Sequence, residues 1–126
     1  MSELDFSLVN TRNIGSEAEL RQKIVASLKL SSKERENRLK RAKSKPDTRY
    51  TLVKSFNRNP DVVAHVLLRS SGKCEKCKCE APFKRKTDMT PYLEVHHIKP
   101  LAEGGEDTAK NALALCPNCH REAHYG

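Results

Sequence analysis

The 126-residue sequence is short of the side chains that build large apolar cores: it has no tryptophan, three phenylalanines and three tyrosines. A chain of this length has room for one compact domain and some additional structure. Small cores commonly need a further constraint, and a bound metal ion is one such constraint. The composition therefore favours a small domain held together by metal.

Long apolar runs are also missing. No stretch approaches the roughly 20 apolar residues that a membrane-spanning helix requires. Met1 is followed by Ser-Glu-Leu-Asp, which lacks the basic and then apolar pattern of a signal peptide. We therefore expect a cytoplasmic protein with no membrane partner.

Five cysteines are present, an odd number that suits metal binding in a reducing compartment better than a disulfide framework. Cys74 and Cys77 form one CxxC pair, and Cys116 and Cys119 form a second pair 42 residues later. Zinc prefers four tetrahedral thiolate or imidazole ligands, and each CxxC turn presents two sulfurs to one ion. These four cysteines predict a structural Zn²⁺ site. Cys79 could replace Cys77, but we interpret it as a bystander.

The formal net charge of +8 is concentrated in one segment. Residues 33–58 contain ten basic and three acidic side chains, a net charge of +7, whereas residues 1–32 sum to zero and residues 59–126 to +1. A local basic excess suits a phosphate backbone, whose counterions are released on binding. A solvated helix surface explains an isolated charge run equally well. Beside a metal-binding segment we favour a nucleic acid as partner, and the predicted contacts are Arg38, Lys40, Arg41, Lys43, Arg58, Lys84 and Arg85.

Two helices are expected ahead of the cysteines. The segment that begins at Ser16 has the spacing of a capping box, and a leucine or isoleucine then recurs every four residues, which predicts a helix over about residues 17–30. Its narrow apolar stripe suggests docking on the rest of the chain or on a second copy. Residues 33–45 predict a polar helix that Pro46 ends. This helix is either a connector that orders on DNA or a frayed linker.

Weak alternation over residues 49–53 predicts a short strand. Asn59 and Pro60 are typical of an N-cap and a first helical residue, and Gly72 should end that helix. His65 falls between the apolar positions of the helix, so we expect it at the surface. The cysteine-rich segment then contains two strand-like stretches and a helical one: residues 92–98, 111–115 and 117–125.

Four histidines indicate a second metal site. His96 and His97 are adjacent near the end of a predicted strand, and His120 and His124 have i, i+4 spacing on a predicted helix. Each one alone is compatible with ordinary packing, but the four together are not well explained that way. Neighbours on a strand point to opposite faces, so His96 and His97 can share one site only if the strand ends or twists there.

Several separated motifs resemble those of the HNH endonucleases. They are Leu-Glu-Val-His-His-Ile at 93–98, Gly-Gly-Glu-Asp at 104–107, Asn111, and Leu-Cys-Pro-Asn-Cys-His at 115–120. The order and spacing are similar to the branch with zinc-binding CxxC pairs, the 5-methylcytosine-specific restriction protein A type. The resemblance covers about residues 56–126. It implies a ββα-metal finger, with two strands and a helix around an ion.

The resemblance also implies roles for individual residues. His97 corresponds to the general base that takes a proton from the attacking water. His96 and His120 correspond to ligands of one catalytic divalent ion, Mg²⁺, Mn²⁺ or another, and His124 lies where some relatives have a further ligand. Asn111 corresponds to the asparagine whose amide holds the loop and orients His97. The implied catalytic residues are thus His97, Asn111 and His120.

The combined prediction is an α+β chain: a helical, basic extension or linker over residues 1–48, then a zinc-stapled HNH nuclease domain over residues 49–126. The resemblance implies double-stranded DNA as the substrate and metal-dependent hydrolysis of its phosphodiester bonds, leaving 5′-phosphate and 3′-hydroxyl ends, with a restriction-type role. One active site cuts one strand, so a double-strand break needs a homodimer or two successive nicks. The alternative is a catalytically silent, zinc-dependent DNA-binding adaptor, which has no need for His97.

Overall fold

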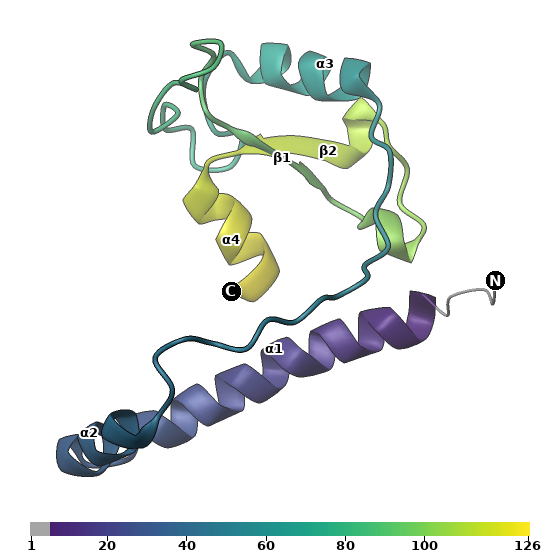
Figure 1. Cartoon of the computed structure of the whole chain (residues 1–126). Coiled ribbons are helices and arrows are strands. Elements are labelled where there is room, and N and C mark those ends of the chain that lie inside the picture. The colour runs from purple at the N-terminus through teal and green to yellow at the C-terminus, as the bar shows by residue number, and fades with distance from the viewer. Residues whose placement is uncertain (1–5) are drawn as a thin grey trace. The chain divides into compact units, whose positions relative to one another are not determined.

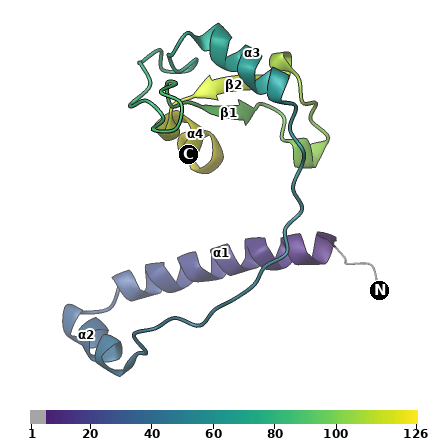
Figure 2. The same ribbon diagram turned by 45° about the horizontal axis from the view of Figure 1, so that its top comes forward.

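The computed structural model describes residues 6–126, and the side chains from residue 17 onward. Two compact units make up the chain, Met1–Ser55 and Phe56–Gly126. The predicted boundary at residues 48–49 stays a prediction, and the first five residues of the predicted extension lie outside the described part. Figures 1 and 2 show the elements of each unit.

The first unit begins with helix α1 (Phe6–Leu28). The predicted start near residue 17 was wrong, because Ser16 lies inside the helix. Residues 6–15 contain one glycine and no proline, so nothing in that segment is strong enough to stop a helix. The predicted apolar stripe is exposed, with 60% of Leu20 and 68% of Leu28 accessible to solvent.

Helix α2 (Ser32–Arg41) follows after a tight turn. Ser31 is its N-cap, and the Ser31 hydroxyl accepts the Glu34 N–H at 3.1 Å. The Arg35 guanidinium donates to the carbonyl oxygens of Ser27 at 2.8 Å and Leu30 at 3.0 Å, which fixes the turn between the two helices. The Ser27 carbonyl also accepts the Leu30 N–H at 3.1 Å, so hydrogen bonds to carbonyls at the end of α1 hold this turn without an apolar core.

Two predictions for this region need correction. Helix α2 ends at Arg41, before the predicted end near residue 45. Residues 49–53 have no regular secondary structure and do not form the predicted strand. A strand gains its hydrogen bonds only from a neighbouring strand, and the sheet of the described chain has two strands, both in the second unit.

The second unit contains helix α3 (Pro60–Ser70), strands β1 (Glu94–His97) and β2 (Ala112–Leu115), and helix α4 (Pro117–Tyr125), with short 3₁₀ turns at Leu101–Glu103 and Ala109–Asn111. The predicted cap of α3 is confirmed: the Asn59 side chain accepts the Asp61 N–H at 2.9 Å. Ser71 and Gly72 end the helix with φ values of 52° and 78°.

The two strands pair antiparallel, with Glu94 opposite Leu115 and His97 opposite Ala112. Opposite residues of an antiparallel pair share a face of the sheet. Figures 1 and 2 show α3 on one side of this sheet and α4 on the other. One face therefore carries Val95, His97, Ala112 and Ala114, and the other carries Glu94, His96, Leu113 and Leu115.

The core is small, as the composition predicts. Its buried apolar members are Val66, Cys74, Leu93, Val95, Ala112, Ala114 and Leu115. A cysteine of the first CxxC pair is thus part of the core. The α+β fold class is confirmed. Within the described chain, no helix has both the length and the apolar character that crossing a bilayer requires.

A salt bridge joins α3 to the first CxxC loop and to β2. The Arg69 guanidinium contacts the two Glu75 carboxylate oxygens at 2.8 and 2.7 Å, and it also donates to the Ala112 carbonyl at 2.8 Å. Glu75 in turn accepts the Ala114 N–H at 2.8 Å. The hydrogen bond from Arg69 holds the pKa of Glu75 below its usual value.

Replacing this carboxylate tests its contribution. We expect Glu75→Gln to lower the free energy of unfolding by about 1–3 kcal/mol, the usual cost of losing hydrogen bonds to a charged group. Because the folded pKa is below the ordinary value of 4.5, the stabilisation is full above that value and is lost as pH falls through the folded pKa. Urea denaturation of metal-loaded protein measures both effects. Glu80→Gln, an exposed residue of the same loop, is the control, and equal losses in the two variants would contradict the assignment.

Candidate metal centres and active site

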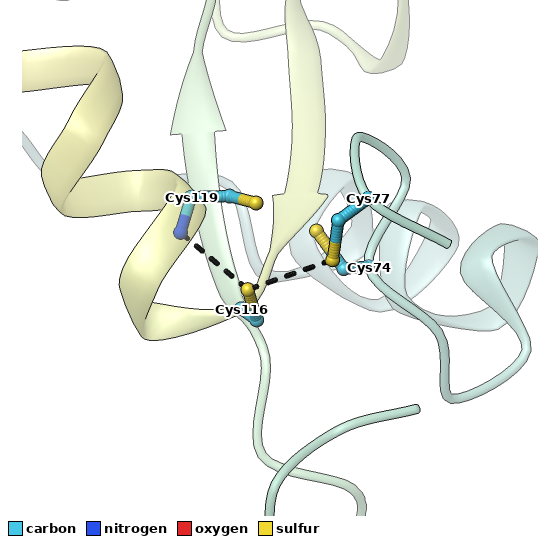
Figure 3. Close-up of side chains that lie close together, drawn as sticks. All are labelled: Cys74, Cys77, Cys116 and Cys119. Carbon is cyan, nitrogen blue, oxygen red and sulfur yellow. Dashed lines mark hydrogen bonds between the residues drawn. The ribbon is translucent and has the colours of Figure 1, made fainter. Parts of the chain in front are cut away.

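The four predicted cysteines come together in one cluster. Their sulfur atoms all lie within 4.8 Å of one another. Figure 3 shows Cys74 and Cys77 on a loop, Cys116 at the end of β2 and Cys119 on the first turn of α4, with the sulfurs directed toward a common centre. Cys79 is outside the cluster and exposed.

The backbone shapes both CxxC turns for this arrangement. In the first turn, the Cys74 N–H donates to the Cys79 carbonyl and the Lys78 N–H donates to the Cys74 carbonyl, both at 2.9 Å. Lys78 has a φ of 64°, which lets the chain fold back tightly. In the second turn, the Cys116 sulfur caps α4 by accepting the Cys119 N–H at 3.4 Å.

The chemistry of the four thiols suits a divalent cation. Burial raises the pKa of Cys74, but N–H groups of Cys116, Cys77 and Lys76 outweigh it and bring this pKa down to about 6. The Cys119 pKa is raised to about 12, first by its hydrogen bond with Cys116. A cation that prefers thiolates, such as zinc, matches this donor set.

Three histidines form a second group, on the face of β1 that meets α4. One ring nitrogen from each of His96, His120 and His124 lies within 4.8 Å of the others. The ring centroids are 4.8 to 5.2 Å apart. Burial, followed by the charges of neighbouring imidazoles, lowers the pKa of His96. A neutral imidazole is the form that binds metal.

A carboxylate orients one of these rings. Glu94 contacts Nδ1 of His120 at 2.9 Å, which leaves Nε2 toward His124, 3.1 Å from its Nε2. Glu94 is itself held by the Tyr92 hydroxyl at 2.7 Å, and this hydrogen bond lowers the Glu94 pKa. Metal-binding histidines commonly give their second nitrogen to a carboxylate. The three imidazoles therefore fit a divalent ion.

His97 lies apart from this group. It is on the opposite face of β1, with 5% of its side chain exposed. Its Nε2 is 2.9 Å from the Asp107 carboxylate, and the second Asp107 oxygen accepts the Asn59 N–H at 2.7 Å. Both His96 and His97 belong to the paired part of β1, so the two adjacent imidazoles lie in different environments.

Asn111 fixes the loop between His97 and Asp107. Its side-chain oxygen accepts the Lys99 N–H at 2.9 Å, and its amide donates to the carbonyls of Lys99 at 3.0 Å and Glu106 at 2.7 Å. The predicted loop-holding part of its role agrees with these contacts. The side chain that contacts the His97 ring is Asp107.

Two residues of the site escaped the sequence interpretation: Asp107 and Glu94. Glu94 precedes His96 by two positions on a strand, a spacing that places both on one face and could have indicated it. Asp107 lies ten positions from His97, and no periodic pattern connects them.

The predicted DNA-contact residues fall in different settings. Those around α2, namely Arg38, Lys40, Arg41 and Lys43, are exposed, as is Lys84. Arg85 lies 4.4 Å from the centre of the Tyr92 ring and donates to the Leu93 carbonyl at 3.1 Å. Arg58 approaches the Val95 carbonyl at 3.5 Å. Arg85 therefore has a clear structural role, and its contact with DNA stays a prediction.

Comparison with known families agrees with this geometry. Residues 74–126 match the family described as HNH endonuclease. This segment is an HNH domain. The resemblance based on separated motifs is therefore confirmed, and its CxxC pairs and histidines lie within the matched residues.

Two curated proteins are similar to parts of the chain that carries the HNH domain. The Type IV methyl-directed restriction enzyme EcoKMcrA of Escherichia coli is 55% identical over 74 residues, which are 59% of this chain and 26% of that enzyme. Anaredoxin of Nostoc is 45% identical over 31 residues, 25% of this chain and 41% of that protein. The chain thus spans about a quarter of the length of the restriction enzyme.

Among solved structures, the Type IV phosphorothioation-dependent restriction endonuclease ScoMcrA is 40% identical in the matching region. The match covers 55% of this chain and 13% of that one, with a TM-score of 0.48.

The thiol cluster predicts that one cysteine change removes the fold of the HNH domain. We expect Cys74→Ser to lose the structural metal and to unfold the domain, because zinc binding of this kind supplies on the order of 10 kcal/mol of folding free energy. Metal content and far-ultraviolet circular dichroism measure the two effects. Cys79→Ser is the matched control and should retain both. A folded Cys74→Ser protein with unchanged metal content would show that the cluster is not a structural site.

Proposed function

We propose that this chain hydrolyses phosphodiester bonds of DNA. The observation that supports it most strongly is the separation of the adjacent histidines on β1. His96 joins His120 and His124 as a group of nitrogen donors, whereas His97 stands alone with a carboxylate partner. Metal-assisted hydrolysis requires donors that hold an ion and a residue that can act as general base, and the two adjacent histidines of β1 supply one of each. A catalytically silent adaptor does not require a histidine that is held by a carboxylate.

His97 is the proposed general base. A water molecule attacks phosphorus and gives one proton to the imidazole, while the bond between phosphorus and the 3′ oxygen breaks. The departing oxygen takes a proton from solvent, so the products carry a 5′-phosphate and a 3′-hydroxyl. The pKa of a free imidazole, about 6.5, makes histidine suitable for this transfer near neutral pH.

His96, His120 and His124 are the proposed ligands of the catalytic ion. When bound, a divalent ion supplies positive charge that stabilises the phosphorane-like transition state and the leaving oxygen. Three imidazoles with no carboxylate among the ligand atoms favour Mn²⁺, Co²⁺, Ni²⁺ or Zn²⁺ over Mg²⁺, which prefers oxygen. Glu94 is the residue that orients His120 for this task.

DNA is the proposed substrate for two reasons. The chain is basic overall, and its exposed positive side chains gather around α2. The similar region of EcoKMcrA belongs to a methyl-directed restriction enzyme, so a restriction-type role on modified DNA is the proposal for a protein that contains this HNH domain. One histidine site cuts one strand, and a double-strand break therefore needs a second copy or a second nicking event.

Exchange of the proposed base tests the activity. We expect His97→Ala to reduce plasmid nicking in Mn²⁺ by at least about 100-fold, the usual lower limit for a general base, with unchanged structural metal. Methylated and unmodified plasmids should be digested side by side. His65→Ala, an exposed histidine of α3, is the control and should cut at the wild-type rate. Full activity in His97→Ala would refute the base assignment, and wild-type protein that binds but never cuts DNA would favour the adaptor.

The basic residues around α2 should govern the salt dependence of DNA binding. We expect the triple change Lys40→Gln, Arg41→Gln and Lys43→Gln to weaken binding and to reduce the slope of log affinity against log salt by roughly 2 to 3, since each lost phosphate contact removes about 0.9. Fluorescence anisotropy at several salt concentrations measures the slope. The matched control removes three charges from α1 and the turn that follows it: Arg21→Gln, Lys23→Gln and Lys29→Gln. Equal slopes for the two triple variants would assign the effect to net charge alone.

A further inference from the structure

We propose that Asp107 is a positioning residue that fixes the tautomer of His97, so that Nδ1 is the nitrogen that receives the proton of the attacking water. This inference rests on the proposed function, because it specifies how the base of that reaction is prepared. It gives the aspartate of the Gly-Gly-Glu-Asp segment the role of orienting the His97 ring, a role that the sequence motif alone does not indicate.

The geometry around Asp107 leaves little freedom to its carboxylate. One oxygen is 2.9 Å from Nε2 of His97, and the other accepts the Asn59 N–H at 2.7 Å. The two contacts come from different directions, one from the sheet and one from the start of α3. Rotation of the carboxylate would break both contacts, so the oxygen facing His97 is held in place.

The charge of Asp107 determines which partner donates. The Asn59 N–H and then the contact with His97 lower the pKa of Asp107 from its usual value. The carboxylate is therefore ionised at neutral pH, and an ionised carboxylate only accepts hydrogen bonds. Nε2 of a neutral His97 must then carry the hydrogen, which leaves Nδ1 with a free electron pair.

Nδ1 is also the nitrogen that water can reach. In the described part of the chain, every buried side-chain nitrogen or oxygen has a hydrogen-bond partner. The contact with Asp107 through Nε2 is the hydrogen bond that the described structure gives to the His97 ring. Nδ1 has no such partner, so it must lie at the surface even though 95% of the side chain is covered.

The loop that carries Asp107 is rigid for identifiable reasons. The Asn111 amide donates to the carbonyl of Glu106, the residue next to Asp107, at 2.7 Å. Gly105 packs so closely that a Cβ there would be 2.0 Å from the Lys99 carbonyl oxygen, and its N–H donates to the Pro100 carbonyl at 2.9 Å. Asn111 therefore acts on His97 through Asp107.

The same contact helps after proton transfer. When Nδ1 has taken the proton of water, His97 is an imidazolium and still donates its Nε2 hydrogen to Asp107. The negative carboxylate stabilises this cation while the bond between phosphorus and the 3′ oxygen breaks. Carboxylate–histidine pairs assist proton transfer in this way on unrelated folds.

Asp107→Asn separates this role from a purely structural one. An asparagine has one acceptor where Asp107 uses two. If the oxygen stays on the Asn59 N–H, the amide donates to Nε2 and moves the hydrogen of neutral His97 to Nδ1. We expect kcat to fall by at least about 100-fold while KM for DNA changes less than about threefold. Glu103→Gln, an exposed change of equal charge in the same loop, should cut at the wild-type rate.

The tautomer can be measured without any cleavage. In zinc-loaded wild-type protein at mildly alkaline pH, long-range ¹H–¹⁵N correlation spectra should show hydrogen on Nε2, with His97 assigned by its absence in His97→Gln. In Asp107→Asn the hydrogen should move to Nδ1. Hydrogen on Nδ1 in the wild type, or wild-type kcat in Asp107→Asn, would overturn the inference. Wild-type protein without nuclease activity, or an active His97→Ala, would overturn the proposed function instead.

Discussion

The convergence of four sulfur atoms is the constraint on which the second unit depends. It joins two loops whose first cysteines are 42 residues apart, and Cys74 is also a member of the small core. Cys116 both completes the cluster and caps α4, so the same residue sets the start of the helix that carries His120. An apolar core of seven residues has little capacity to hold this geometry without the metal. The cysteines therefore act as scaffold, and the histidines are available for the proposed chemistry.

Side chains of the short strand β1 alternate between its two faces, and this alternation separates the proposed metal ligand from the proposed base. His96 faces α4 and joins two imidazoles that α4 presents one turn apart, and Glu94 on the same face orients the His120 ring. His97 faces the other way, toward Asp107 and the start of α3. In the proposed reaction, these neighbouring residues serve as metal ligand and as base without competing for one ion. Adjacent residues on a strand point to opposite faces, so this separation requires no additional structural element.

Local patterns predicted much of this arrangement, and long-range contacts explain what they missed. The CxxC spacing, the Asn59 cap and the terminal helix all depend on residues within four positions of one another, and each is present as expected. The start of α1 was misplaced because a capping pattern at Ser16 also fits a helix interior. The strand at residues 49–53 needed a neighbour that a sequence does not reveal. Asp107 reaches His97 only because Asn111 closes a loop between them.

The central claim is that a structural metal at the cysteines stabilises the fold, whereas a separate ion at the histidines is needed only for cleavage. The most direct test adds Mn²⁺ to zinc-loaded wild-type protein and to the His96→Ala, His120→Ala double variant, and follows plasmid nicking and thermal unfolding together. The account predicts that nicking begins only in the wild type, while both proteins keep their zinc and unfold at similar temperatures. Equal nicking by the double variant, or loss of its zinc and fold, would contradict the claim.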